Sequence, residues 1–437
     1  MQQDPRVILD REPMRRLQVL AVGLCVLLNA LDGFDVLAIS FASPGIAAEW
    51  GIDRAALGLV LSMELIGMAV GSVLIGNLAD RIGRRPTILG CLVVMAVGMA
   101  AAPLSGSVFA LSMIRLFTGL GIGGMLACTN AMVAEFANLR NRALAVAVMA
   151  AGYPVGAIVG GSIASALLAS GGWRDVFTFG ACVTALFLPL TWWLLPESIG
   201  FLVQKRPPNA LARVNQTLSK MGHATVDALP APVTGTAASL RALFSPGLVG
   251  TTVLLTAAYF AHIMTFYFIL KWVPKIVVDM GYAPSTAGGV LVWANVGGLA
   301  GALALSLLTR RVPLRLLILV ALIGSAAMVA WFGQGQDSLR GLALVAACAG
   351  FFTNAGVVGL YALIAQAFPT AVRGSGTGFV IGIGRGGAAL GPIVAGALFA
   401  AGASLPMVAI CMALGSGIAA VALLALTRRR QVGGATA

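Results

Sequence analysis

Six ionisable side chains fall within long apolar stretches of the sequence. They are Asp32, Asp35, Glu64, Arg115, His262 and Arg385. A charged group at the centre of a bilayer costs at least about 2.5–3.5 kcal/mol on insertion scales, so such residues usually have a function or a partner. They are therefore the first candidates for chemistry in this chain.

The acidic members of this set are grouped near the beginning of the chain. Asp32 and Asp35 are three residues apart, so they share one face of a helix. Glu64 and Arg115 are expected at a similar depth in their own helices. One interpretation is a structural ion pair between Arg115 and an acid of the first helix. The other is a proton relay, which is favoured because three acids face two arginines and one carboxyl group is left over.

Arg385 lies about halfway through a glycine-rich apolar stretch that leaves its guanidinium accessible. The planar fork of an arginine matches a carboxylate with two parallel hydrogen bonds. We therefore expect Arg385 to bind the carboxylate of a substrate. A packing or gating arginine paired to an acid is the alternative.

Aromatic and polar side chains supply candidates for the rest of a binding site. Tyr259, His262 and Phe266 have spacings of three and four residues and share a helix face, which suits an aromatic ring. His262 could contact substrate, relay a proton, or simply be hydrogen-bonded inside the protein. The remaining expected substrate-binding residues are Asn354 and Tyr361, seven residues apart, and Phe34 between the two acids.

The elements that must position these residues are apolar segments long enough to cross a bilayer. The chain has 437 residues, of which 59% are hydrophobic and only 10% are charged, whereas soluble domains carry about 25% charged residues. Apolar segments of about 20 residues are what a bilayer requires. We place them at about 17–43, 56–79, 86–104, 107–134, 140–168, 173–195, 248–273, 284–309, 313–334, 338–365, 371–400 and 403–426.

This pattern predicts an all-α polytopic membrane protein with twelve transmembrane helices in two six-helix halves. The expected parts are a tail at 1–16, a first bundle at 17–195, a linker at 196–247, a second bundle at 248–426 and a tail at 427–437. The linker contains a short amphipathic helix near 209–221. Basic turns after Asp80 and Phe136 recur about 230 residues later, as expected for duplicated halves.

The basic residues predict the orientation. Most of the 28 lysines and arginines fall on one side if the N-terminus is cytoplasmic. Lys271 and Lys275 are among the few expected outside. Both termini are therefore predicted to be cytoplasmic, in a bacterial-type inner membrane. The first apolar segment is too long to be a cleavable signal.

The most specific motif joins the second and third segments. It reads Gly76-Asn-Leu-Ala-Asp80-Arg81-Ile-Gly83-Arg84-Arg85 and resembles the loop signature of the major facilitator superfamily. Glu135 and Arg142 resemble the next cytoplasmic turn, and Pro196-Glu197-Ser198 resembles the usual end of the sixth helix. The resemblance implies that these loop residues control conformational change, with Asp80 holding the two halves together across their interface.

Four further segments resemble the aromatic acid:proton symporter family within that superfamily. They are Leu31-Asp32-Gly33-Phe34-Asp35, Trp272-Val-Pro274-Lys275, Phe368-Pro-Thr370-Ala-Val-Arg373-Gly374, and Gly382-Ile-Gly384-Arg385-Gly386-Gly387-Ala388. The resemblance implies a proton-coupled symporter that imports a small aromatic carboxylate by alternating access. Glu64 is not a general feature of that family.

The expected partners are an organic anion, protons and the lipid bilayer, with no nucleic acid, and the carrier is expected to be a monomer. We find no phosphate-binding loop and no His/Cys metal pattern. We therefore expect no cofactor, no metal, and a proton gradient as the energy source. The alternatives are a carrier for another organic anion, a drug exporter, or a membrane-embedded enzyme or sensor, for which the loops offer no motif.

Overall fold

The computed structural model describes residues 4–231, 240–369 and 372–434, with the side chains of residue 240 and of 428–434 left aside. These residues are helical or irregular, and no strand occurs among them. Parts of the predicted linker (232–239), of the motif after Phe368 (370–371) and of both tails (1–3, 435–437) lie outside the described residues.

Twelve helices are long and apolar enough to cross a membrane, which confirms the predicted fold class. In the first half of the chain they are α2 (Arg16–Trp50), α3 (Arg54–Ile82), α4 (Arg84–Ala101, continued by a 3₁₀ turn Ala102–Leu104), α5 (Val108–Phe136), α6 (Arg142–Ser170) and α7 (Trp173–Leu194). In the second half they are α10 (Val249–Asp279), α11 (Pro284–Leu308), α12 (Leu314–Phe332), α13 (Leu339–Ala367), α14 (Arg373–Ala400) and α15 (Leu405–Gly434).

The helix surfaces carry many exposed large apolar side chains. Val97, Leu186 and Val421 are each more than 60% exposed. A water-facing surface does not carry such a density of apolar groups, whereas lipid accommodates them. In lipid the backbone N–H and C=O groups have no water to bond with, so they must form hydrogen bonds within the protein. Long α-helices meet this requirement within a single segment.

The chain divides into two compact units. The first unit comprises residues 1–36, 67–157 and 177–236, and the second comprises 37–66, 158–176 and 237–437. The boundaries cut α2, α3 and α6 near their middles. The second unit therefore contains one end of each of these three helices in addition to the six helices of the second half.

Within the first unit, α2 and α6 approach closely because small residues face each other. A Cβ atom at Gly156 would lie 1.7 Å from the carbonyl oxygen of Ala30, and one at Gly33 would lie 2.0 Å from that of Tyr153. Small residues allow transmembrane backbones to come this near, so that dispersion contacts hold the helices together. Gly33 is the residue between the two acids of α2, so this contact also fixes their position.

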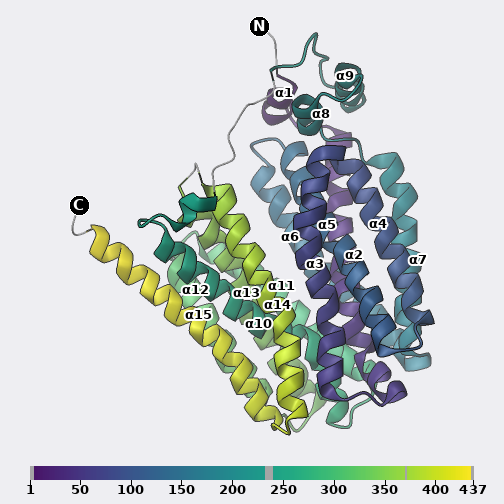
Figure 1. Ribbon diagram of the computed structural model, residues 1–437, viewed down its shortest axis with the longest axis vertical. Helices are drawn as coiled ribbons and strands as arrows, with labels where there is room; N and C mark the ends of the chain where they lie inside the picture. Colours follow the sequence, from purple (N-terminus) through teal and green to yellow (C-terminus); the bar gives the residue numbers. More distant parts are fainter. Residues whose placement is uncertain (1–3, 232–239, 370–371, 435–437) are drawn as a thin grey trace. The chain divides into compact units, whose positions relative to one another are not determined.

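Three short helices of the first unit lie together, as Figure 1 shows. They are α1 (Pro5–Arg11), α8 (Ile199–Lys205) and α9 (Ala210–Met221). The predicted amphipathic helix near 209–221 is confirmed as α9, whereas α1 and α8 were not predicted. Their few residues have no long periodic pattern, and α1 is held by contacts with α5 and α8 instead.

Hydrogen bonds and ion pairs fasten α1 to the rest of its unit. Asp10 forms an ion pair with Arg142 at the start of α6, and its carbonyl oxygen accepts a hydrogen bond from the Leu139 backbone N–H at 3.0 Å. The buried His223 lies 2.6 Å from the carboxylate of Glu12 and 2.9 Å from Gln18 Oε1. The described residues that precede α2 are thus part of the folded unit.

Within the second unit, α10 packs against α14 and α15, while α13 packs against α11 and α12. The crossing of α11 and α13 again relies on glycine, because a Cβ at Gly350 would lie 1.9 Å from the Ala294 carbonyl oxygen. α10 is the most enclosed of these helices, with seventeen buried residues. Side chains of α10 are therefore well placed to line or support a site.

We predict that Gly156→Ala destabilises the protein by about 1–3 kcal/mol or more, because the added methyl group overlaps the Ala30 carbonyl oxygen. Gly23→Ala is the matched control, since nothing lies within 4 Å of a Cβ at that position. Thermal unfolding in detergent measures both. Equal melting temperatures for the two variants would contradict the close α2–α6 contact.

Candidate functional site

The structure brings the two acids of α2 and Arg115 of α5 into one buried cluster of the first unit. Asp32, Asp35 and Arg115 are each at most 2% exposed. The Arg115 guanidinium donates to the Asp35 carbonyl oxygen at 2.9 Å. This hydrogen bond joins α5 to the backbone of α2.

Arg115 also contacts two apolar neighbours. Its guanidinium lies 3.2 Å from the Met99 sulfur and 5.3 Å from the centroid of the Phe177 ring. A cation over an aromatic face is stabilised by the ring quadrupole, more strongly where water is excluded. Gly180 of α7 leaves room beside the Asp35 carboxylate, which would lie 3.6 Å from a Cβ there. The cluster is therefore enclosed by α2, α4, α5 and α7.

Phe34, predicted to contact substrate, packs inside the first unit. Its ring makes an edge-to-face contact with Phe179 at a centroid distance of 5.5 Å, and the residue is 4% exposed. Within the described conformation its ring contributes to helix packing around the two acids.

Glu64 belongs to the second unit, and its partner was not predicted. Its carboxylate lies 3.5 Å from the Lys271 ammonium, and both side chains are fully buried. The prediction that Lys271 lies outside is wrong. The predicted span ends near residue 273, whereas α10 continues through Pro274 to Asp279, so Lys271 lies two turns inside the helix.

A second group in this unit gathers around Arg385 of α14. Tyr259 of α10 and Tyr361 of α13 are joined through their hydroxyl groups at 2.9 Å, with ring centroids 5.4 Å apart. Arg385 is near enough to the Tyr259 hydroxyl to interact with it electrostatically. Three of the predicted substrate-binding residues thus come together from three helices.

Arg385 differs from the other intramembrane charges in its surroundings. Its side chain is half-buried. Among the described residues it makes neither an ion pair nor a hydrogen bond through its side chain, whereas Tyr361 beside Tyr259 is 37% exposed. The charge of Arg385 is therefore not neutralised by a carboxylate among the described residues.

Gly384 is the residue that allows this arrangement. A Cβ at Gly384 would lie 1.9 Å from Cδ1 of Tyr259, so only glycine leaves space for the tyrosine ring against α14. The glycines around Arg385 thus serve a packing purpose as well as leaving its side chain accessible.

His262 lies apart from this group, fully buried between α10, α13 and α15. Its Nε2 atom donates to the Thr353 carbonyl oxygen at 2.9 Å, and Nδ1 lies 2.9 Å from Ser416 Oγ. Ser416 in turn lies 2.8 Å from Ser325 Oγ on α12. Of the three roles considered for His262, the structure supports the internal hydrogen bond, because both ring nitrogens are already occupied by protein.

The other two predicted lining residues are partly buried. Asn354 donates to the Gly298 carbonyl oxygen at 2.7 Å, which ties α13 to α11. Phe266 packs edge-to-face on Tyr267 with centroids 5.2 Å apart. Both rings of this α10 pair remain partly accessible, so they stay candidates for contact with an aromatic ligand.

The predicted gating residues form a network on one face of the first unit. The Arg84 guanidinium pairs with Asp80 at 2.5 Å and lies 3.9 Å from the Glu135 carboxylate. Glu135 accepts a hydrogen bond from Ser198. In this conformation the partner of Asp80 is thus within its own unit, and the Asp80 side chain is 59% exposed.

Glu197, part of the Pro196-Glu197-Ser198 motif, caps a helix, a role that the sequence did not predict. Its Oε1 atom accepts hydrogen bonds from the backbone N–H groups of Arg84 and Arg85, at 2.9 and 3.2 Å. These are unsatisfied donors at the N-terminus of α4, where the helix dipole also favours an anion. Gly83 has a φ of 109°, a region that favours glycine, and turns the chain so that this contact forms.

The remaining gating residues have simpler surroundings. Arg85 donates to the Trp192 carbonyl oxygen at 2.5 Å and covers the Trp192 ring. Arg142 pairs with Asp10 of α1. Arg81 is exposed, and Gly76 faces Ala127 of α5.

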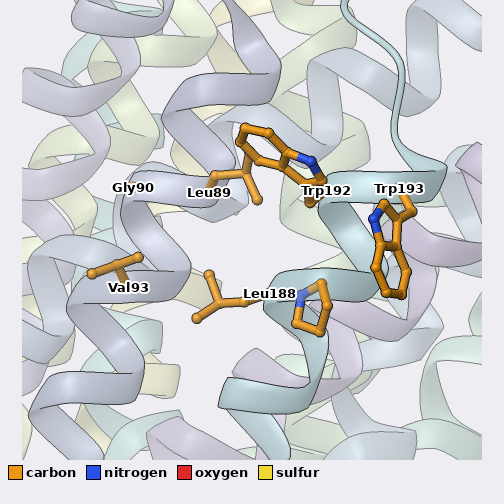
Figure 2. A pocket seen from close by; sticks show the side chains of 7 residues that line it. Leu89, Gly90, Val93, Leu188, Trp192 and Trp193 are labelled. Atoms are coloured by element: carbon orange, nitrogen blue, oxygen red, sulfur yellow. The ribbon is translucent and has the colours of Figure 1, made fainter.

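An open groove between α4 and α7 is a poor candidate for the substrate site. Figure 2 shows the side chains of Leu89, Val93, Leu188, Trp192 and Trp193 around it, with Gly90 and Pro189 completing the lining. All of these groups are apolar apart from the indole N–H. An organic anion needs a cationic or hydrogen-bonding partner, and this groove is suited to lipid chains.

Comparison with known proteins identifies the class. The sequence profile of the Major Facilitator Superfamily matches residues 25–338 and 255–436, so the chain belongs to this superfamily of carriers. Its relatives lie among aromatic acid transporters, which confirms the predicted family resemblance.

Three curated relatives illustrate the similarity. The chain is 31% identical to the gallate transporter of Pseudomonas putida over 424 residues, covering 95% of this chain and 93% of the relative. It is 31% identical to the 3-(3-hydroxy-phenyl)propionate transporter of Escherichia coli, covering 94% of each. It is 29% identical to a 4-hydroxybenzoate transporter of Acinetobacter baylyi, covering 96% and 93%.

Solved structures show the same fold at lower sequence identity. A bacterial homologue of the human lysosomal transporter Spinster has a TM-score of 0.74 at 16% identity, covering 95% of this chain and 98% of the other. A D-xylose–proton symporter has a TM-score of 0.68 at 18% identity, covering 93% and 96%. The family match and the curated relatives show that the chain is a carrier and not an enzyme.

We predict that Gly384→Ala weakens binding of 4-hydroxybenzoate about tenfold, because the methyl group displaces Tyr259 from the side of Arg385 at a cost of about 1–3 kcal/mol. Gly382→Ala is the control, since a Cβ there meets nothing within 4 Å. Isothermal titration of the two purified variants measures the affinities. If both bind like the wild type, the Tyr259–Arg385 group does not form the site.

Proposed function

We propose that this carrier imports a small aromatic carboxylate together with protons. The observation that carries the proposal is Arg385, a half-buried arginine within a membrane span that has no carboxylate partner among the described residues. A charge at this depth is costly unless an anion compensates it. A transported carboxylate supplies that anion.

The surroundings of Arg385 support a ligand with an aromatic body. The hydroxyl groups of Tyr259 and Tyr361 contact each other, and Tyr259 interacts electrostatically with Arg385. Aromatic rings prefer offset or edge-to-face contacts with other rings, and phenolic hydroxyl groups can bond to ring substituents. The names of the relatives, transporters of gallate, 4-hydroxybenzoate and 3-(3-hydroxy-phenyl)propionate, all describe acids of this chemical class.

Buried carboxyl groups support the proton-coupled part of the proposal. Asp32, Asp35 and Glu64 are all buried within spans, beside the cations Arg115 and Lys271. A group of this kind can carry a proton across the bilayer when its exposure to either side alternates. No cofactor enters the proposal, because the proton gradient supplies the energy.

We further propose that both termini face the cytoplasm of a bacterial-type inner membrane and that the carrier acts as a monomer. The basic turns around Arg84 and Arg142 support this orientation. The exposed Asp80 is available to engage the other half of the protein when the cytoplasmic side closes.

The proposal predicts uptake of radiolabelled 4-hydroxybenzoate or gallate into proteoliposomes, with accumulation only when the outside is more acidic than the inside. The panel should include aliphatic carboxylates and cationic drugs. Accumulation of aliphatic acids with no aromatic uptake would favour a carrier for other organic anions, and export of drugs would favour an exporter. A collapsed pH gradient is the control for each compound.

Two substitutions test the assigned roles. Arg385→Ala should raise the apparent Km about tenfold or more, because a charge-assisted hydrogen bond contributes about 1.5–3 kcal/mol. Arg385→Lys should recover only part of the loss, because lysine lacks the bidentate fork of arginine.

Asp32→Asn should abolish accumulation driven by the pH gradient. Full gradient dependence in Asp32→Asn would remove Asp32 from the proton path.

A further inference from the structure

The turn between α11 and α12, in the second unit, carries a cluster of three arginines. They are Arg310, Arg311 and Arg315. Arg310 and Arg311 are exposed, whereas Arg315 lies in the first turn of α12 and is partly buried. With the rest of the described residues, the side chains of this cluster form neither ion pairs nor hydrogen bonds. Their positive charge is therefore not neutralised locally.

The second half of the sequence has no acidic residue near this cluster. After residue 236 the sequence contains only two acids, Asp279 and Asp337. Asp279 ends α10, just before α11 begins, and Asp337 lies just after α12 ends. α11 has 25 residues and α12 has 19. Each acid is thus separated from the turn by the length of a helix, about 28 Å or more.

The first half of the chain adds four acids to this unit, and they also lie far from the turn. Three of them lie where α2 ends and where α3 and α7 begin, namely Glu49, Asp53 and Asp175. That end of the helices also holds Asp279, which pairs with Arg54 of α3. The fourth, Glu64, lies beside Lys271, two turns from Asp279 in α10. Within this unit the turn is a region of positive charge alone.

A surface cavity of about 300 Å³ lies beside the cluster, between α12 and α13. It is lined by Pro313, Leu314, Arg315, Leu363, Gln366 and Ala367. Ligand cavities commonly measure about 300–1,000 Å³. The polar side chains in the lining are those of Arg315 and Gln366, and the Gln366 amide has no hydrogen bond to other described residues. The cavity therefore presents a cation and an amide donor in an otherwise apolar lining.

The cavity is held in shape by the packing of three helices. Leu314 and Leu317, on either side of Arg315, pack against a buried cluster of Leu305, Ala321 and Ala355. These residues belong to α11, α12 and α13. The backbone of Arg315 is thus fixed at the mouth of the cavity, while its side chain remains partly accessible.

Exposed leucines show that the cluster lies at the boundary between the hydrocarbon and the water. Leu307 and Leu308, at the end of α11, are 62% and 46% exposed, and Leu316 of α12 is 52% exposed. In a membrane such side chains are covered by acyl chains. The arginines begin where these apolar surfaces end, which is the level of the phospholipid head groups.

We propose that this turn binds an anionic phospholipid, with its phosphate at Arg315 and Gln366 and its acyl chains over the exposed leucines. A guanidinium forms two parallel hydrogen bonds with phosphate oxygens. Arg310 and Arg311 add the electrostatic attraction that favours an anionic over a zwitterionic lipid. The inference does not depend on the transported substrate.

Membrane orientation alone does not account for this arrangement. Basic residues at the ends of spans orient a membrane protein, and for that role only their number and their side of the membrane matter. A cavity lined by one of the arginines together with a glutamine is not needed for orientation. Both features are what a phosphate ester requires, because its oxygens accept hydrogen bonds as well as carrying charge.

The apolar groove between α4 and α7 lacks these features. No charged side chain is in its lining. The nearby Arg85 covers the Trp192 ring and donates to the Trp192 carbonyl oxygen, so its guanidinium already has partners within the protein. Lipid chains in this groove should therefore bind without a preference for the charge of the head group.

The proposal is tested by native mass spectrometry of the purified protein, titrated with phosphatidylglycerol and with phosphatidylcholine of the same acyl chains. The wild type should bind phosphatidylglycerol at least about tenfold more tightly. Each arginine near an anionic head group contributes about fivefold. The triple variant Arg310→Gln/Arg311→Gln/Arg315→Gln should therefore lose about a hundredfold in phosphatidylglycerol affinity and keep its affinity for phosphatidylcholine.

The matched control removes three exposed basic residues from α8 and α9, in the variant Lys205→Gln/Arg213→Gln/Lys220→Gln. It has the same net charge as the first triple variant and should bind phosphatidylglycerol like the wild type. Arg315→Gln alone should lose about fivefold or more. Glycerol phosphate, the head group without acyl chains, should not displace the lipid.

Three results would overturn the inference: equal wild-type affinity for the two lipids, wild-type affinity in the arginine triple variant, or the same loss in the control triple variant. Displacement by glycerol phosphate would show a site for soluble phosphate esters instead. The comparison of the two lipids uses only the wild type, so it decides the matter even if a variant fails to fold. Each of these results leaves the proposed transport function untouched.

Discussion

Neutralisation of buried charge is the constraint on which the arrangement of this carrier depends. Water is absent from the interior of the spans, so each ionised side chain there must find a compensating group or cost several kcal/mol. Arg115 meets this requirement with the Asp35 carbonyl oxygen, a thioether and an aromatic ring, and Lys271 meets it with Glu64. Arg385 has no such carboxylate among the described residues, and a transported anion is the compensating group that we propose for it.

Glycine makes this charge placement possible. The acids of α2 are held against α6 by Gly33, the tyrosine beside Arg385 fits only because residue 384 has no side chain, and Gly83 turns the chain so that Glu197 reaches the start of α4. In each case the absence of a side chain at the glycine lets a neighbouring segment or ring pack closely or lets the chain turn. This close packing or turn fixes the position of a nearby polar side chain. The abundance of glycine is therefore part of the electrostatic arrangement as well as of the packing.

The bilayer made much of the fold predictable. Twelve spans follow from apolar length, because a lipid-exposed segment has few other ways to satisfy its backbone. The short helices α1 and α8 were not predicted, because they are too short for a periodic pattern and tertiary contacts stabilise them. Lys271 was misplaced because the span was ended six residues too early, and His262 could not be assigned because its partners, Thr353 and Ser416, are distant in sequence. Pairings between distant residues are what the sequence alone leaves open.

The docking of α1 has a consequence for how the protein is made. Glu12 lies 2.6 Å from His223, a residue 211 positions later in the chain. During synthesis this contact is impossible until the first six spans and the segment up to α9 have left the ribosome. The segment that follows α1 thus completes its contacts late, although it is among the first parts of the chain to be made.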